Sequence, residues 1–232
     1  MTRLILSLAL VLTWSVARVS RAVDLLDNTT AGISTNSIEA LSTTAWASFA
    51  FTVGGTPYSI DNLQVILGLG GATSTGNLTV QLYAASGGGQ PTGAALASKT
   101  VTGLTFNNYF AGLTPGDAAT IDTTVGSTGS WQIQASQSYA IVYSTSISAG
   151  LVSSSPNTQL SPGTSGLTFL GRTFTSDSGG NWGPLSTNGI SWMKVTGTAA
   201  VPEPSTWALG AIATGVMAAI ARRRNARNGS TV

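Results

Sequence analysis

Short apolar runs that alternate with polar residues, each closed by a cluster of turn residues, restrict this chain to a fold built from β-strands. Alternation places every second side chain on one face of a strand, as with Phe49, Phe51 and Val53. The pattern predicts strands at residues 46–53, 59–69, 77–84, 131–135, 138–145, 167–174 and 190–196. Turns are predicted where glycine, proline, serine and asparagine gather, at residues 87–89, 115–116, 178–181 and 188–189.

The runs recur at intervals of about ten residues, which is typical of a sandwich of antiparallel strands. No segment between residues 23 and 200 has the length and helical period of a crossover helix, so a parallel α/β sheet is not expected. The sequence therefore predicts an all-β domain over residues 23–200, a β-sandwich with jelly-roll-like topology.

Residues 1–22 have the three parts of a secretory signal peptide: a short basic start, an apolar stretch at 4–17, and small residues before a cleavage site. Ser20 and Ala22 occupy the −3 and −1 positions, which predicts signal cleavage after Ala22. An earlier site after Ala17 stays open, because arginines flank the later one. The alternative to cleavage is an anchor helix, for which the apolar stretch is short.

Three unlike features follow one another at the carboxyl end, between residues 201 and 232. They are Pro202-Glu203-Pro204, an apolar run at 207–221 that predicts one short transmembrane helix, and the basic cluster Arg222, Arg223 and Arg224. Fifteen helical residues span about 22 Å, less than the roughly 30 Å of a bilayer core. The positive-inside rule leaves the arginines in the cytoplasm and the body outside.

The prolines keep the chain before the helix extended and present Glu203 at the membrane surface, in a shape that a protease can grip. The apolar run is rich in alanine and glycine, so it makes a weak permanent anchor. The tail is therefore interpreted as a transient handle that a processing enzyme removes. A plain carboxyl-terminal anchor is the alternative.

Residues 201–224 closely resemble the PEP-CTERM sorting signal of Gram-negative and related bacteria. The resemblance implies recognition by exosortase, a membrane protease with a cysteine nucleophile that processes its substrates near the Pro-Glu-Pro motif. Carried over to this chain, it makes Pro202, Glu203 and Pro204 the recognition motif and Arg222–Arg224 the stop-transfer signal. The implied route runs from export, through membrane anchoring, to the cell surface, outer membrane or extracellular matrix.

The body resembles the choice-of-anchor R domain, which is found upstream of various surface-sorting tails. The matching stretches, spread over residues 27–198, are ASFAFTVGGTPYSIDNLQVILGL, LTVQLYAASGGGQPTGAALAS, WQIQASQSYAIVYST and SDSGGNWGP. This resemblance implies a β-sandwich on an anchored surface protein, and it brings no catalytic residue or ligand with it.

Charge and residue types exclude several functions for the body. Residues 23–200 hold three bases and seven acids, a net charge of −4, so a nucleic-acid interface with clustered basic residues is not expected. The chain has no cysteine and no histidine, which removes the thiol nucleophile, the usual general base and the commonest metal ligands. We expect no enzyme activity, no catalytic residue, no metal site and no cofactor.

Two weaker site hypotheses remain. Asp24 with Asp27, and Asp177 with Asn181, carry oxygens that suit calcium; the alternatives are a polar edge and an Asx turn. Aromatic rings that could stack on sugars are Trp131, Trp182, Trp192, Tyr109 and Tyr143. Trp182, in a glycine-rich loop, is the candidate for sugar contact, whereas the positions of Trp131 and Trp192 in strands favour a place in the core.

The sequence thus predicts an exported, non-enzymatic protein of the cell surface or extracellular matrix, structural or adhesive in the envelope or a biofilm. Its expected partners are an exosortase-type membrane protease, the membrane itself and, less directly, extracellular polysaccharide. A carbohydrate-binding surface module is the alternative function, and a hydrolase that relies on aspartates is a third.

Overall fold

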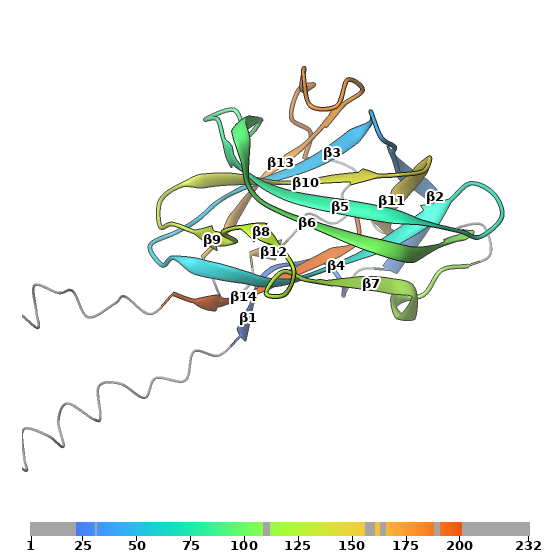
Figure 1. The fold of residues 1–232 in the computed structure, drawn as a ribbon. Helices are drawn as coiled ribbons and strands as arrows, with labels where there is room; N and C mark the ends of the chain where they lie inside the picture. The colour runs from blue at the N-terminus through green and yellow to red at the C-terminus, as the bar shows by residue number, and fades with distance from the viewer. Residues whose placement is uncertain are drawn as a thin grey trace, which may run out of the picture. The chain divides into compact units, whose positions relative to one another are not determined.

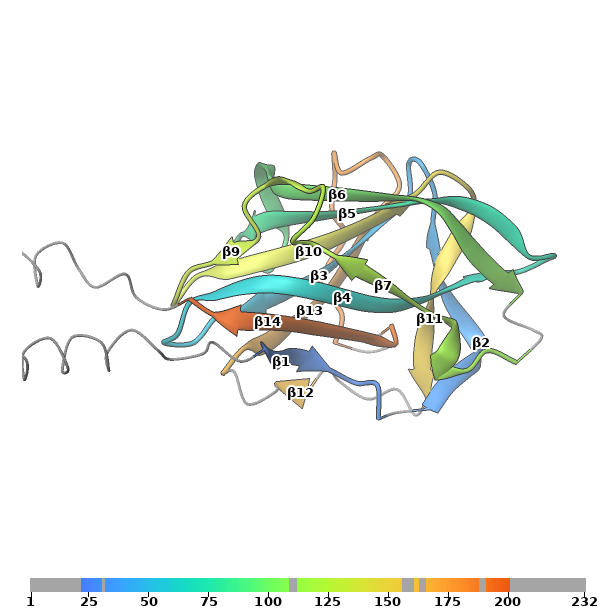
Figure 2. The ribbon, with the colours of Figure 1, turned by 60° about the horizontal axis from the view of Figure 1, so that its bottom comes forward.

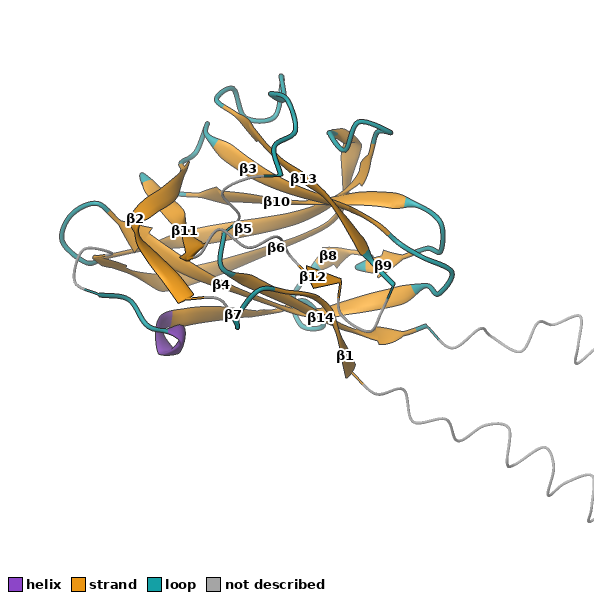
Figure 3. Ribbon diagram, turned by 180° about the vertical axis from the view of Figure 1, so that it is seen from behind, coloured by secondary structure: helices purple, strands orange, loops and turns teal. Residues whose placement is uncertain are grey.

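The structure, a computed structural model, describes residues 22–30, 32–108, 112–155, 161–162, 166–187 and 191–200. The chain divides into two compact units, Met1–Ala200 and Val201–Val232, and every described residue lies in the first. The strands are β1 (Ala22–Asp27), β2 (Gly32–Leu41), β3 (Trp46–Thr52), β4 (Tyr58–Leu69), β5 (Ser74–Ala85), β6 (Pro91–Asn108), β7 (Ala118–Asp122), β8 (Thr128–Gly129), β9 (Gln132–Ile133), β10 (Ser138–Thr145), β11 (Ala149–Ser155), β12 (Ser161–Pro162), β13 (Thr168–Thr175) and β14 (Met193–Ala199). One short helical turn, η2 (Pro115–Asp117), precedes β7 (Figure 3).

Strand β4 links two groups of strands. One group is β12, β1 and β14, and the other is β6, β5, β10, β3 and β13. Strand β4 pairs antiparallel with β14 and with β7, and it meets β6 in a short parallel contact at Gly68–Asn107. The strand order is β12-β1-β14-β4-β6-β5-β10-β3-β13 (Figure 1). The described chain is therefore all-β, as predicted, with an arrangement consistent with a sandwich or a half-barrel.

The two groups of strands share one apolar core. Phe49 of β3, Leu63 of β4 and Leu78 of β5 are each at most 1% exposed and belong to a single buried cluster. Successive side chains of a strand point to opposite faces, so each strand can turn one of its faces toward this core. A smaller cluster, made of Ile66, Val152 and Trp192, is buried separately from the main core.

Most of the predicted strands are confirmed, one is shortened and one is displaced. The run predicted at 131–135 forms only the two residues of β9, because Ser136 has a positive φ of 60° and the Gln134 N–H bonds to the Tyr139 hydroxyl. The run predicted at 190–196 appears as β14, shifted toward the carboxyl end. The turn predicted at 188–189 lies outside the described residues.

The predicted signal peptide up to Arg21, the Pro-Glu-Pro motif, the short transmembrane helix and the arginine cluster also lie outside the described residues. Within the described part of the chain, no helix has the length and apolar character needed to cross a membrane.

Candidate functional site

The two ends of the body lie side by side. Strand β1 begins at Ala22 and β14 ends at Ala199, and the two strands pair antiparallel with Ala22 opposite Thr198 (Figure 2). The predicted signal peptide therefore ends, and the tail begins, at the same end of the sheet. We call this end of the body, formed by Val23, the loop at 54–57, Thr198 and Ala200, the terminal pole.

The chain is held firmly up to its last described residue. The Ala200 N–H donates a hydrogen bond of 2.9 Å to the Pro57 carbonyl. Strand β14 is paired along both edges, to β1 and to β4. Gly197 allows the close approach of the three strands, since a Cβ there would lie 2.2 Å from the Ser59 carbonyl oxygen and 2.8 Å from Leu25 Cδ1.

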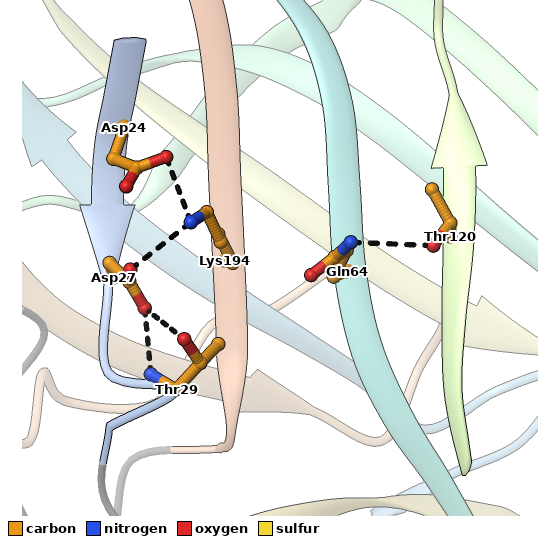
Figure 4. Close-up of polar contacts among 6 residues, drawn as sticks. All are labelled: Asp24, Asp27, Thr29, Gln64, Thr120 and Lys194. Carbon is orange, nitrogen blue, oxygen red and sulfur yellow. Dashed lines mark hydrogen bonds and ion pairs between the residues drawn. The ribbon is translucent and has the colours of Figure 1, made fainter. Parts of the chain in front are cut away.

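Two carboxylates of β1 face an ammonium group of β14 (Figure 4). Lys194 Nζ lies 2.9 Å from Asp24 Oδ1 and 3.4 Å from Asp27 Oδ2. The hydrogen bond to Asp24 and the charge of Asp27 raise the pKa of Lys194. Asp27 also accepts hydrogen bonds from the Thr29 backbone and hydroxyl, at 2.7 and 2.6 Å. The two carboxylates are thus engaged by Lys194 and Thr29 in the structure.

The carboxylate of the second calcium candidate, Asp177, accepts hydrogen bonds from its own loop. The Asn181 amide donates to Asp177 Oδ2 at 2.6 Å and its backbone N–H donates to Oδ1 at 2.9 Å. The Thr175 hydroxyl donates to the same carboxylate, and together these bonds lower the pKa of Asp177 to about 2. Among the described residues, no three acidic side chains come close enough together to hold a metal ion.

Another carboxylate, that of Asp61, lies near the terminal pole. Burial and the nearby charge of Asp122 raise the pKa of Asp61, and hydrogen bonds with Thr198 and Ser59 oppose that shift. Thr198 and Ser59 are themselves partners across β14 and β4. Asp61 therefore ties the pole's two central strands together through its side chain.

The predicted aromatic platform does not assemble. Trp131 is 5% exposed, Trp192 is 3% exposed and Tyr143 is fully buried, so the expected core position of both tryptophans is confirmed and the sugar-contact hypothesis for Tyr143 is wrong. Tyr109 lies outside the described residues. Trp182 is half-buried beside Gly179.

The sequence reasoning missed a second ring, that of Trp46, beside the glycine that Trp182 approaches. A Cβ on Gly179 would lie 3.0 Å from the ring of Trp46 and 3.7 Å from that of Trp182, so the two rings contact the same glycine. Gly179 has a positive φ of 89° and sits in the loop after β13. The signal that could have found Trp46 is its place at the first residue of a strand, next to a turn.

The residues that follow the terminal pole match a known sorting motif. Residues 200–225 match the PEP-CTERM protein-sorting motif. The match starts at Ala200, the last described residue, and includes Pro202, Glu203, Pro204 and the cluster Arg222–Arg224. The resemblance of the tail is thereby confirmed. A PEP-CTERM motif implies export and membrane processing, with an exosortase as the enzyme that recognises it.

A search of curated proteins finds no match to the chain. Among solved structures, a chain from the structure of the infectious bursal disease virus Gx strain is similar at 15% identity, with a TM-score of 0.22. The similarity covers 80% of this chain and 41% of the viral chain, so this chain spans less than half the viral chain's length. At that TM-score the likeness carries no argument.

Proposed function

We propose that this protein is exported and sorted through its PEP-CTERM tail by an exosortase-type protease, and serves as a non-enzymatic structural or adhesive component of the cell envelope or a biofilm. The observation that carries the proposal is the sorting-motif match at residues 200–225, which follows directly on the end of β14. A signal peptide at residues 1–22 supplies the export step.

In this proposal the tail acts twice. The short helix at 207–221 and Arg222–Arg224 first hold the protein in the membrane with the body outside. The protease then acts near Pro202, Glu203 and Pro204. The body is released to the cell surface, the outer membrane or the extracellular matrix.

We propose further that the body is a choice-of-anchor R-like, jelly-roll-like sandwich without a catalytic site. Support comes from its carboxylates, which are engaged in ion pairs and hydrogen bonds within the fold. Glu39, the single body glutamate, pairs with Arg172, while Asp24 and Asp27 pair with Lys194. Asp177 is engaged in its turn. We do not propose carbohydrate binding, because three of the five rings that would form the platform are buried.

Intact-mass analysis of the protein from its native host tests the proposal. The outer-membrane and matrix fractions should contain a species that lacks Arg222–Arg224, and Glu203→Ala should accumulate the unprocessed form in the inner membrane. Asn228→Ala, which lies beyond the motif match, is the control and should be processed like the wild type. A dominant surface species that still carries the arginines would reject the proposal.

A further inference from the structure

The sorting motif begins close to a fixed point of the fold. Ala200 is hydrogen-bonded to Pro57, and Val201 alone separates it from Pro202. Residues 201–206, between Ala200 and the predicted helix, can span at most about 20 Å even when fully extended. The motif is therefore confined to a short distance from the terminal pole.

The chain cannot gain reach by peeling β14 from the sheet at low cost. Removing β14 would break its ladders to both β1 and β4. It would also expose Met193 and Val195, which are fully buried. Burial of apolar side chains of this size stabilises the sheet, so the folded sheet holds the start of the tail in place.

We propose that the terminal pole is a docking surface for the membrane-embedded protease that processes the tail. This inference rests on the proposed function. An enzyme that encloses Pro202-Glu203-Pro204 must surround the extended chain with its own residues. On the amino-terminal side of the motif, only Val201 separates that enclosed chain from the body, so the enzyme surface lies against the body. The contact is therefore part of substrate recognition whenever the body is folded.

The loop at 54–57 is the part of the pole that such an enzyme meets first. Pro57 carries the carbonyl that binds Ala200, and Gly55 and Thr56 beside it are exposed. A Cβ on Gly55 would have no neighbour within 4 Å. A large side chain at Gly55 would thus project from the pole without disturbing the fold.

The chain offers a matched control at the opposite end of β4. Gly71 follows the end of this strand and is exposed, and a Cβ on it would likewise have no neighbour within 4 Å. Twelve strand residues place it about 40 Å from the pole. Gly55→Arg and Gly71→Arg therefore add the same bulk and charge to the two ends of the body.

The experiment measures tail processing by pulse-chase in the native host, with full-length wild type, Gly55→Arg and Gly71→Arg. Each is made with the native connection and with eight glycine and serine residues inserted after Ala200. We expect Gly55→Arg to slow processing about tenfold in the native connection, and Gly71→Arg to process at the wild-type rate. With the inserted linker, Gly55→Arg should be processed at the same rate as the wild type that carries the linker.

Three results would overturn the inference. In the first, Gly55→Arg is processed at the wild-type rate. In the second, Gly55→Arg is slowed equally with and without the linker. In the third, Gly71→Arg is slowed as much as Gly55→Arg. The first would mean that the enzyme acts before the body folds or without touching it. Thermal unfolding of each purified variant excludes misfolding as the cause of slow processing.

Two further arms separate the neighbouring explanations. If even the wild type keeps its tail and Glu203→Ala changes nothing, the proposed function itself has failed. That failure is distinct from a failure of the docking surface, which would leave the wild type processed. If purified wild type binds vesicles of anionic phospholipid and Gly55→Arg alters that binding, the pole contacts lipid, and the protease-docking proposal is rejected.

Discussion

The guanidinium of Arg172 on β13 forms an ion pair with the carboxylate of Glu39 on β2, whose side chain is only 3% exposed. The two strands are not neighbours in the sheet, so the pair joins separate parts of the body. Burial lowers the pKa of Arg172, and its guanidinium also lies 5.1 Å from the centre of the Phe174 ring. In a body with three bases, this is the most deeply buried charge contact among the described residues.

Arg172→Met should destabilise the protein by about 3 kcal/mol, because it leaves the carboxylate of Glu39 buried without its partner. The double variant Arg172→Met/Glu39→Leu should recover most of that loss, since no buried charge then remains. Urea unfolding of the two single variants and the double variant measures the coupling. Additive losses in the double variant would contradict the prediction.

Gly197→Ala should lower the free energy of unfolding by about 2 kcal/mol, because the added methyl group meets backbone atoms of β4. Gly55→Ala, at an open position, is the matched control and should leave stability unchanged within about 0.5 kcal/mol. Chemical denaturation compares the two. A neutral Gly197→Ala would mean that β14 is not packed tightly between β1 and β4.

Lys194→Met should have a small effect, about 0.5 kcal/mol, that shrinks as salt is added, because Asp24 and Lys194 are both partly exposed. Partners in the fold raise the pKa of Lys194, so its contribution is complete below the ordinary lysine pKa of about 10.4. That contribution is lost as the pH rises through the higher folded-state value. Unfolding measured from pH 8 to 11 should show a steeper decline in the wild type than in the variant, because the buried Tyr143, whose pKa burial raises, contributes equally to both.

The Asp177 carboxylate should titrate near pH 2 in a carbon-detected NMR experiment. Its pKa is depressed, so its contribution to stability is present above the unfolded value of about 3.9 and is lost as the pH falls toward 2. Asn181→Ala removes the hydrogen bond from the side-chain amide and should move the midpoint toward the ordinary range. An unchanged midpoint in that variant would show that the amide does not help to set the pKa.

The strands whose large apolar residues alternate in the sequence were predictable. Strand β10 has the predicted bounds, and β3 and β4 differ from theirs by one residue. Burial along β3 and β10 is nearly continuous, so the alternation lies in the residue types rather than in their exposure. Strand β6 was missed, since its alanine, serine and threonine residues give little contrast between faces. Strand β1 was missed because it is short and starts at the predicted cleavage site.

The sorting tail could be predicted because its signal is local: three features in one order within a few dozen residues. The terminal pole could not, because the pairing of Ala22 with Thr198 joins residues at opposite ends of the body and leaves no mark in either segment. The contact of Gly179 with Trp46 and Trp182 was hidden for the same reason. Pairing between distant strands depends on the whole core rather than on any one stretch.

The place of β14 between β1 and β4 has a mechanical consequence. While the tail is anchored, a load applied to the far end of the body would pull β14 along its own axis. Both of its ladders would then resist in shear, with many hydrogen bonds loaded at once. A pull that separated the two chain ends would instead open β1 from β14 one pair at a time. The fold is thus expected to resist tension between Ala199 and the distal end of the body more strongly than a pull that separates the two chain ends.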